Sequence, residues 1–203
     1  MKRWKNVAVL VVISFLLSFA GCGKKEDAGT NSETGSETNV EMNSIPASEG
    51  DELIKAYSSF ELKSEDLNNG VWDDVISNTD RGSNVSPQLS WQPVEGASVY
   101  AIYMIDLTPH YWIHWISDGV TETNLKQGWA PSSDYVGPYP PEGGPHTYDI
   151  YVIALKKPVE RLKGGVDSQT LKVQEFIDST DTDAEGNTGN IISIGHLSGT
   201  FTR

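Results

Sequence analysis

Beyond residue 53, most apolar side chains fall in short runs of strand length. Val99–Asp106 is apolar at successive positions, as expected of a central strand covered on both faces. Trp112–Ile116 and Thr147–Leu155 are runs of aromatic and β-branched residues. Ile191–Ile194 and Gly199–Thr202 are shorter runs of the same kind near the C-terminus. The pattern predicts a mainly β domain.

The segments between these runs predict one helix and two long loops. Ser168–Asp178 has apolar residues at mixed spacings of three and four, which indicates a weakly amphipathic helix. Residues 71–86 and 121–145 are rich in Asn, Asp, Gly and Pro. Loops of that length in a small domain usually carry function or cover a site. We expect a β-sandwich of mostly antiparallel sheets with one or two small peripheral helices.

The N-terminus has a different hydropathy pattern. Lys2, Arg3 and Lys5 precede Val7–Gly21, an apolar run shorter than the about 20 residues that a membrane-spanning helix needs. A basic start, a short apolar run and small residues at its end are typical of an export signal. The segment Phe19-Ala20-Gly21-Cys22 resembles a bacterial lipobox, although the lipobox prefers Leu where Phe19 stands. The alternative is an uncleaved anchor with an incidental cysteine.

These features divide the chain into three parts. We expect residues 1–21 to be a lipoprotein signal peptide and Cys22 to carry acyl chains, palmitate among them, that anchor the protein in a membrane. Residues 22–52 are rich in Gly, Ser, Thr, Asn and Glu, and we interpret them as a flexible acidic tether. Residues 53–203 are long enough to form one domain with its own core. The expected location is the cell envelope, on the extracytoplasmic side of a membrane.

Charge and cysteine content exclude several classes of function. The 203 residues include 15 Lys and Arg against 28 Asp and Glu, a formal net charge of −13. Loss of residues 1–21 removes Lys2, Arg3 and Lys5 and no acids, which takes the charge from −13 to −16. Nucleic acids are unsuitable partners, because their binding rests on positive charge. The single cysteine excludes an internal disulfide and a zinc site built on cysteines.

A candidate polar cluster lies where two predicted strands meet. If the turn is centred on Pro109, Asp106 faces Trp112, Met104 faces His114, and Asp106 and His114 are diagonal neighbours about 7–8 Å apart at the backbone. A carboxylate beside an imidazole on an aromatic face is either a buried structural pair or the floor of a polar pocket. Considered alone, the pair favours the structural role, because buried polar groups are normally hydrogen-bonded.

Other motifs predict neither a metal site nor a cofactor. His110 and His114 have the i,i+4 spacing of a zinc helix, but they lie in strand sequence beside a proline. The segment 181–186 begins like a calcium loop, yet Ile192 occupies the position of the bidentate acid, so we expect an acidic surface turn. No nucleophile elbow or phosphate-binding P-loop occurs. We interpret His196 as a packing residue at a strand end.

Three separated motifs carry a family resemblance. They are the Pro- and Gly-rich segment 134–148, the segment 84–91 (NVSPQLSW) and Trp112-Ile113-His114-Trp115. Together they resemble the bacterial members of the phosphatidylethanolamine-binding protein family, also called Raf-kinase-inhibitor-like proteins. The resemblance extends from about Phe60 to Arg203 and implies a β-sandwich with peripheral helices, in agreement with the hydrophobic pattern.

The resemblance implies a small anion pocket. Proteins of this family bind phosphate-like and carboxylate groups, including phospholipid headgroups, in such a pocket. By resemblance, the ligand-binding residues are Asp106, Trp112, His114, Gly137, Pro138, Tyr139, His146 and Tyr148. His114 and His146 would be the pocket histidines, and Asp106 would orient one of them and favour its protonated form.

Two departures from the family pattern concern this pocket. The acidic motif Asp106-Leu107-Thr108-Pro109 is one residue short and lacks its second acid, and Thr147 stands where the family has an arginine. The connection from Pro109 to Trp112 is also much shorter than in eukaryotic members, which predicts a wider or differently shaped opening.

Two functions of different classes remain open. The first is an exported, membrane-tethered, non-catalytic binding or inhibitory module that holds a small anion or a phospholipid headgroup, with a protein target as a further partner. We expect its affinity to be weak and to strengthen as the pH falls towards the histidine range near 6.5. The alternative is a hydrolase of phosphate or carboxylic esters that uses His114 or His146 as general base, with Asp106 orienting it. No nucleophile is evident in the sequence, so water would be the attacking group.

Overall fold

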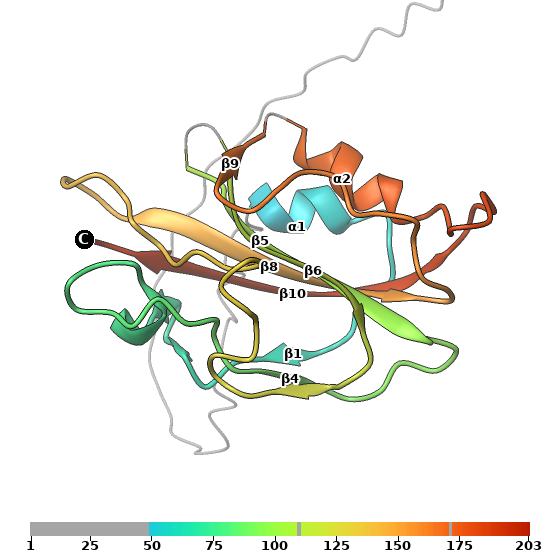
Figure 1. The fold of residues 1–203 in the computed structure, drawn as a ribbon, viewed down its shortest axis with the longest axis horizontal. Helices are drawn as coiled ribbons and strands as arrows, with labels where there is room; N and C mark the ends of the chain where they lie inside the picture. Colours follow the sequence, from blue (N-terminus) through green and yellow to red (C-terminus); the bar gives the residue numbers. More distant parts are fainter. Residues whose placement is uncertain (1–48, 109–110, 171) are drawn as a thin grey trace, which may run out of the picture. The chain divides into compact units, whose positions relative to one another are not determined.

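The computed structural model describes residues 49–108, 111–170 and 172–203 (Figure 1). The predicted signal peptide, Cys22 and nearly all of the predicted tether lie outside these residues. So do Pro109 and His110 at the predicted turn, and Leu171 of the predicted helix. The predictions made for these positions are therefore not addressed by the structure.

In the described part of the chain, ten strands form two sheets. The larger sheet has the order β2-β3-β10-β8-β5-β6-β9 and is antiparallel except for the parallel pair β3 and β10. Its strands are β2 (Leu67–Asn68), β3 (Val71–Trp72), β5 (Val99–Asp106), β6 (Trp112–Val120), β8 (His146–Leu155), β9 (Ser168–Gln169) and β10 (Ile191–Phe201). The smaller, antiparallel sheet has the order β1-β4-β7, with β1 (Leu62–Lys63), β4 (Leu89–Trp91) and β7 (Asn124–Leu125).

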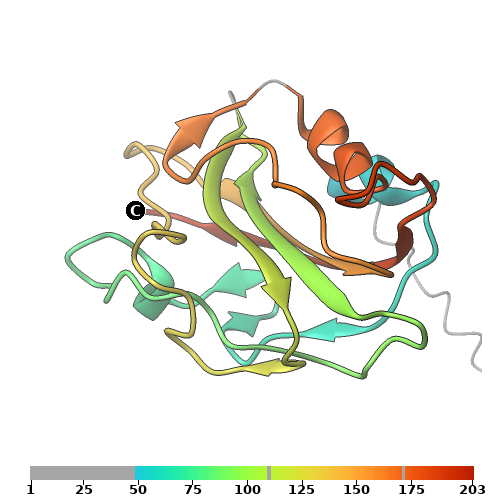
Figure 2. The same cartoon turned by 45° about the vertical axis from the view of Figure 1, so that its right-hand side comes forward.

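Helices are few and short. The described residues contain α1 (Glu49–Ile54), α2 (Val173–Ser179) and one turn of 3-10 helix (Asp74–Ile76). Both α-helices lie over one face of the larger sheet, and β1 and β4 lie on the other side of it (Figures 1 and 2). No helix within the described ranges is long and apolar enough to cross a membrane. The mainly β fold with small peripheral helices is confirmed.

The central strand β5 explains this layered arrangement. All eight of its residues are buried. Successive side chains of a strand point to opposite faces, and both faces of this strand are covered. Tyr100, Ile102 and Met104 belong to the core between the two sheets, which we call the inner core. Ala101 and Tyr103 belong to the core beneath the helices, which we call the helix-side core. The run of apolar residues thus supplies two cores from one strand.

The C-terminal strand differs from its prediction. One strand, β10, replaces the two predicted there, and it pairs with β8 along its length. Glycines interrupt the apolar run without ending the strand, because they make room for aromatic rings. A Cβ at Gly195 would lie 2.5 Å from the Phe60 ring, and one at Gly199 would lie 2.7 Å from the Trp72 indole nitrogen.

Three other elements differ from their predictions. The helix predicted over Ser168–Asp178 begins only at Val173, because Ser168 and Gln169 pair with β6 as strand β9. Strand β6 continues to Val120, beyond the predicted Ile116. The two predicted long loops contain short elements: β3 and the 3-10 helix lie in residues 71–86, and β7 lies in residues 121–145.

Candidate functional site

A cavity of about 390 Å³ opens at the end of the larger sheet where β5, β6 and β8 meet. Seven of the eight side chains expected at an anion pocket line it: Asp106, Trp112, His114, Gly137, Tyr139, His146 and Tyr148. The eighth, Pro138, is buried and does not line the cavity. Its carbonyl oxygen accepts a hydrogen bond from the amide of Asn78 at 3.0 Å, which fixes the loop of Pro138 to a residue that does line the cavity.

A β-bulge brings His114 into the cavity. Asp106 pairs with Trp112, as the sequence predicts, but Met104 pairs with Trp115 and not with His114. The register shifts between Ile105 and Met104, which leaves His114 as an extra residue on β6. The prediction that Met104 faces His114 is therefore wrong, because a strict alternation cannot include a bulge. As a result, two consecutive side chains of β6, His114 and Trp115, lie on the side of the sheet that carries Tyr148.

The partner of Asp106 is His146. Nδ1 of His146 lies 2.7 Å from Oδ2 of Asp106, and the other carboxylate oxygen accepts the backbone amide of Thr108 at 2.8 Å. Both carboxylate oxygens are therefore engaged, and the imidazole of His146 is oriented with a proton on Nδ1. Asp106 is 7 % exposed, so its carboxylate is shielded from bulk water.

His114 is held in a different way. Its Nδ1 donates to the carbonyl oxygen of Val136 at 2.8 Å. Burial lowers the pKa of His114 below 6.5, more than the Val136 carbonyl and the charge of Asp106 raise it. The ring is therefore neutral at neutral pH, with its proton on Nδ1 and a lone pair on Nε2. The expectation of a protonated pocket histidine does not apply to His114.

Tyr148 contributes an unsatisfied hydroxyl group. Its side chain is fully buried, and its oxygen has no hydrogen-bond partner among the described residues. Burial raises the pKa of this hydroxyl, and the charge of Asp106 raises it further, so it stays protonated. The ring packs edge-on against His114 at 5.0 Å and stacks with His146 at 6.4 Å. A buried hydroxyl without a partner costs free energy and points to a ligand or water that completes its bonding.

The Pro- and Gly-rich loop forms the far wall of the cavity. A Cβ at Gly137 would lie 2.1 Å from the carbonyl oxygen of Ile76, so only glycine fits there. The Gly137 amide donates to Oδ1 of Asn84 at 2.7 Å, which ties the loop to a second motif of the sequence. Beyond this point the rim is aromatic, since Tyr139 is 52 % exposed and Trp112 is 38 % exposed.

Sequence reasoning missed several lining residues: Asn78, Val136, Pro140, Pro141, Asp167 and Gln169. Asp167 has the clearest role, because its Oδ1 accepts the indole N–H of Trp112 at 3.1 Å and so fixes one side of the rim. Its backbone is left-handed, with φ 59°, which non-glycine residues rarely adopt. Asp167 and Gln169 reach the cavity through the pairing of β9 with β6. No local signal in the sequence indicates that pairing.

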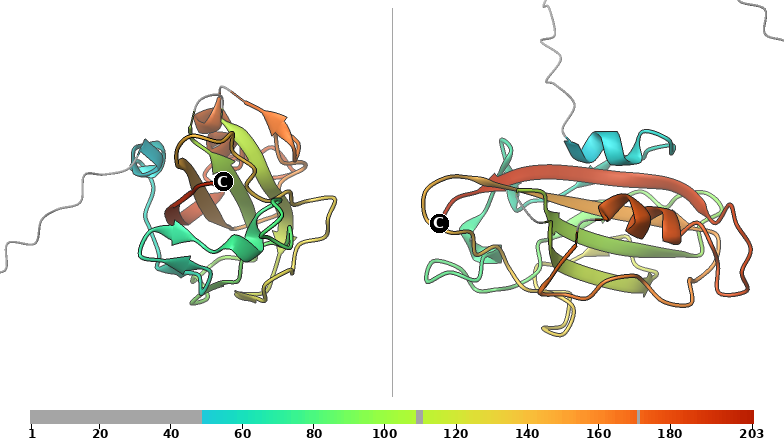
Figure 3. Two further views of the ribbon diagram at one scale, coloured as in Figure 1. Left: turned by 90° about the vertical axis from the view of Figure 1, so that its left-hand side faces the viewer. Right: turned by 90° about the horizontal axis from the view of Figure 1, so that it is seen from above.

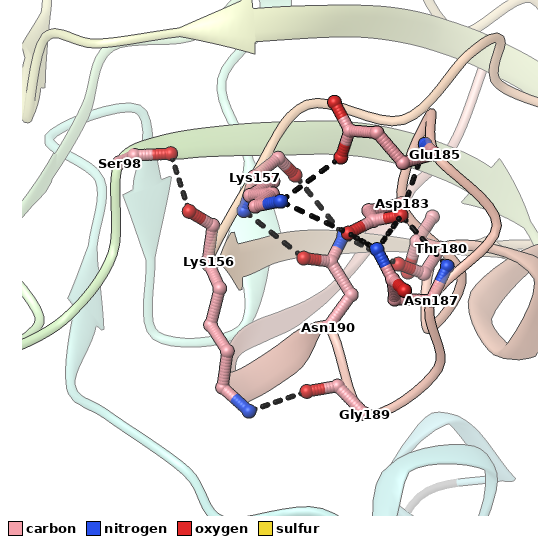
Figure 4. Close-up of polar contacts among 9 residues, drawn as sticks. All are labelled: Ser98, Lys156, Lys157, Thr180, Asp183, Glu185, Asn187, Gly189 and Asn190. Atoms are coloured by element: carbon pink, nitrogen blue, oxygen red, sulfur yellow. Dashed lines mark hydrogen bonds and ion pairs between the residues drawn. The ribbon is translucent and has the colours of Figure 1, made fainter.

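The acidic segment 181–186 forms a closed structural turn (Figure 4). Asp183 is buried, and its Oδ1 accepts the backbone amides of Glu185 and Asn187. The Asn187 side-chain amide bonds both carboxylate oxygens, and Lys157 lies 3.7 Å from Oδ2. The carboxylate is thus occupied by protein donors. No group of three or more His, Cys, Asp or Glu side chains in the described part of the chain is arranged to hold a metal ion.

Comparison with known proteins places this site in context. The model of the family described as phosphatidylethanolamine-binding protein matches residues 63–192. A homologue of that protein from Chlamydia trachomatis has 23 % sequence identity and a TM-score of 0.51, over 72 % of this chain and 99 % of its own. The Escherichia coli protein YbcL, described as a new member of the mammalian family, has 21 % identity and a TM-score of 0.53, over 72 % and 99 %. No curated protein matches. At these identities the two structures establish the fold alone.

Proposed function

The chain belongs to the phosphatidylethanolamine-binding protein family, and we propose that it is a non-catalytic module that binds a small oxyanion in the cavity around His146. The ligand is a phosphate group, either free or in a phospholipid headgroup. The observation that carries the proposal is the buried, unpartnered hydroxyl of Tyr148 beside two imidazoles of fixed orientation. An oxyanion accepts hydrogen bonds and therefore suits the Tyr148 hydroxyl and an N–H of His146.

The two histidines have different parts in this proposal. His146 is oriented by Asp106, so its second nitrogen is the group that donates to the anion once the ring is protonated. His114 is neutral and offers the lone pair of Nε2. The ligand must therefore bring a donor of its own as well as acceptor oxygens. The hydroxyl of a monoprotonated phosphate meets that need, and so does the ammonium group next to the phosphate of an ethanolamine headgroup.

Local contacts must supply the affinity, because the protein as a whole repels anions. The formal net charge is −13, and Asp106 and Asp167 both lie at the cavity. Long-range repulsion is screened by salt, whereas hydrogen bonds in a shielded cavity are not. We expect dissociation constants in the millimolar range at low ionic strength. The affinity should not fall as salt is added, because local hydrogen bonds contribute more to binding than the net negative charge of the protein opposes it.

Export and anchoring complete the proposal. The predicted signal peptide and Cys22 lie outside the described residues, and they support a lipoprotein whose domain faces away from the cytoplasm. Substituting Cys22→Ser should shift the protein from the membrane fraction to the aqueous fraction and abolish labelling with radioactive palmitate. Unchanged fractionation and unchanged labelling would contradict the anchoring at Cys22.

One observation favours a second function. The Asp106–His146 pair has the arrangement of a general base with its orienting carboxylate. Among the described residues, those that line the cavity include no Ser, Thr or Cys, so a hydrolase built on them would have to activate water. Turnover of phosphomonoesters or carboxylic esters by the wild-type protein, abolished in the folded His146→Asn variant, would establish this function in place of the first.

The deciding experiment is a titration of the full chain by isothermal calorimetry. Inorganic phosphate and phosphoethanolamine each carry a donor and should bind at pH 6, whereas dimethyl phosphate carries none and should bind at least about tenfold more weakly. His146→Asn should weaken phosphate binding about tenfold or more, and Gln92→Ala, an exposed change outside the cavity, should have no effect. Equal binding of all three ligands, or an unaltered His146→Asn variant, would overturn the proposal.

A further inference from the structure

A second histidine–carboxylate cluster lies on the opposite face of β8 from the cavity. The imidazole of His196, on β10, lies between two carboxylates: Nδ1 is 2.9 Å from Oδ1 of Asp51, and Nε2 is 2.8 Å from Oδ2 of Asp149. A neutral imidazole carries one N–H and can donate to only one of them. Donation to both carboxylates at once requires the imidazolium form. The second proton of His196 is therefore required for both hydrogen bonds to form together.

The carboxylate of Asp149 is the buried half of this cluster. Asp149 is 0 % exposed, and its Oδ1 has no hydrogen-bond partner among the described residues. Oδ2 receives the His196 nitrogen and, at 3.3 Å, the hydroxyl of Tyr151, whose ring stacks on the imidazole at 4.9 Å. A buried carboxylate with so few donors needs a nearby positive charge. His196 is the cation that lies within reach.

Helix α1 closes the cluster from outside. It runs along β10 (Figure 3), and it supplies Asp51 to His196. Its backbone lies against the pair at Gly50, where a Cβ would come within 1.7 Å of the Asp149 carboxylate. Ile54 anchors the other end of α1 in the helix-side core. The helix is thus held at one end by apolar packing and at the other by a charge pair.

We propose that the Asp149–His196 pair is a docking site for the acidic helix α1, and that a proton on His196 holds the helix in place. With the proton bound, His196 bridges Asp51 to Asp149. Without it, one of the two hydrogen bonds from His196 is lost and the two negative charges repel each other across a neutral ring. The packing of Ile54 alone does not hold a helix of six residues, so α1 leaves the sheet and the chain around Lys55 becomes accessible.

Both carboxylates bonded to the His196 ring favour its protonated form. Asp51 faces the ring from α1, Asp149 and Tyr151 face it from β8, and the charge of Glu49 acts on the neighbouring Tyr151. Glu49 accepts the hydroxyl of Tyr111. Burial disfavours the imidazolium, but the bonds to Asp149 and Asp51 outweigh it and raise the pKa of His196 above 6.5. Docking is therefore complete in acid and is lost as the pH rises through that raised value.

Tryptic cleavage after Lys55, an exposed residue at the end of α1, tests the docking in the full chain. The Asp51→Ala variant provides the comparison, because it removes the outer carboxylate and leaves the buried pair intact. At pH 6 the wild-type chain should be cut at least about tenfold more slowly than this variant, since a hydrogen bond to a charged group is lost in the variant. At pH 9 the two rates should agree within about twofold, and taking the ratio at each pH removes the pH dependence of trypsin.

Two further variants make the result decisive. Gly50→Ala leaves every charge in place but obstructs docking, so it should be cut rapidly at both pH values. His196→Gln should behave like Asp51→Ala; if it does not fold, the other two variants still answer the question. A ratio of rates that is the same at pH 6 and pH 9, or a Gly50→Ala variant as resistant as the wild type, would overturn the proposal.

Discussion

Nδ1 of His146 lies 2.7 Å from Oδ2 of Asp106, although the two residues are 40 positions apart in the chain. Strands β5 and β8 are adjacent in the larger sheet, and their pairing brings Asp106 opposite Tyr148, two residues beyond His146. The carboxylate therefore orients one imidazole of the cavity, while the other, His114, is oriented by a backbone carbonyl. This asymmetry gives the two histidines opposite hydrogen-bonding roles.

Replacing Tyr148 with Phe should weaken phosphate binding without destabilising the fold. The Tyr148 hydroxyl has no partner within the described structure, so its loss should leave the free energy of unfolding unchanged or raise it by up to about 1 kcal/mol. Phosphate affinity should fall about three- to tenfold. Tyr135→Phe is the matched control, because that buried hydroxyl donates to the Ile76 carbonyl at 2.9 Å and its loss should cost about 1 kcal/mol. Chemical denaturation and calorimetric titration measure both quantities, and a destabilised Tyr148→Phe variant with full affinity would refute this assignment.

The lowered pKa of His114 should appear in the pH dependence of stability. The native state keeps this ring neutral, whereas the unfolded chain protonates it below about 6.5. Its contribution is complete above about pH 6.5 and is lost as the pH falls, with a limiting slope of about 1.4 kcal/mol per pH unit. In His114→Asn the side-chain amide can still donate to Val136 but does not titrate. His196 contributes with the opposite sign, but equally in the wild type and in His114→Asn. The difference between the unfolding free energies of the two proteins, measured from pH 8 to 5, therefore isolates His114. A difference that does not depend on pH would exclude the effect.

Gly137 should tolerate no side chain. A Cβ there would meet the Ile76 carbonyl at 2.1 Å, so Gly137→Ala must displace the cavity wall, and we expect a loss of about 3 kcal/mol or more. Gly144→Ala, in the same loop, has nothing within 4 Å of the new methyl group and should change stability by less than about 0.5 kcal/mol. Thermal denaturation distinguishes the two variants, and equal melting temperatures would show that the wall yields without cost.

The negative charge of Asp167 should weaken anion binding in the wild-type protein. Its carboxylate lies at the cavity and holds the Trp112 indole, and Asp167→Asn keeps an oxygen for that hydrogen bond while removing the charge. Phosphate affinity should rise about two- to fivefold at low salt, and the gain should shrink as salt is added. Glu95→Gln changes the net charge equally at an exposed position outside the cavity and should have no effect. A gain shared by both variants would assign it to net charge alone.

Much of the site is visible in the sequence as residue types in particular segments. The family resemblance supplied the eight expected residues, and seven of them border one cavity. Five of the seven lie at the paired ends of β5, β6 and β8. The partner of Asp106 was not predictable, however. The bulge at His114 and the entry of Asp167 through β9 both depend on pairing between distant segments. Neither leaves a local pattern.

The same division applies to the whole protein. By itself the sequence determined the mainly β class, because the alternation and continuity of apolar residues report which faces of each strand are buried. Its resemblance to a known family supplied the residue types of the cavity. Only the tertiary structure decided that β10 is one strand, that His146 and not His114 bonds Asp106, and that Gly50 brings α1 onto Asp149 and His196. Those outcomes depend on strand register and on contacts across the sheet. Both are set by interactions between residues that lie far apart in the chain.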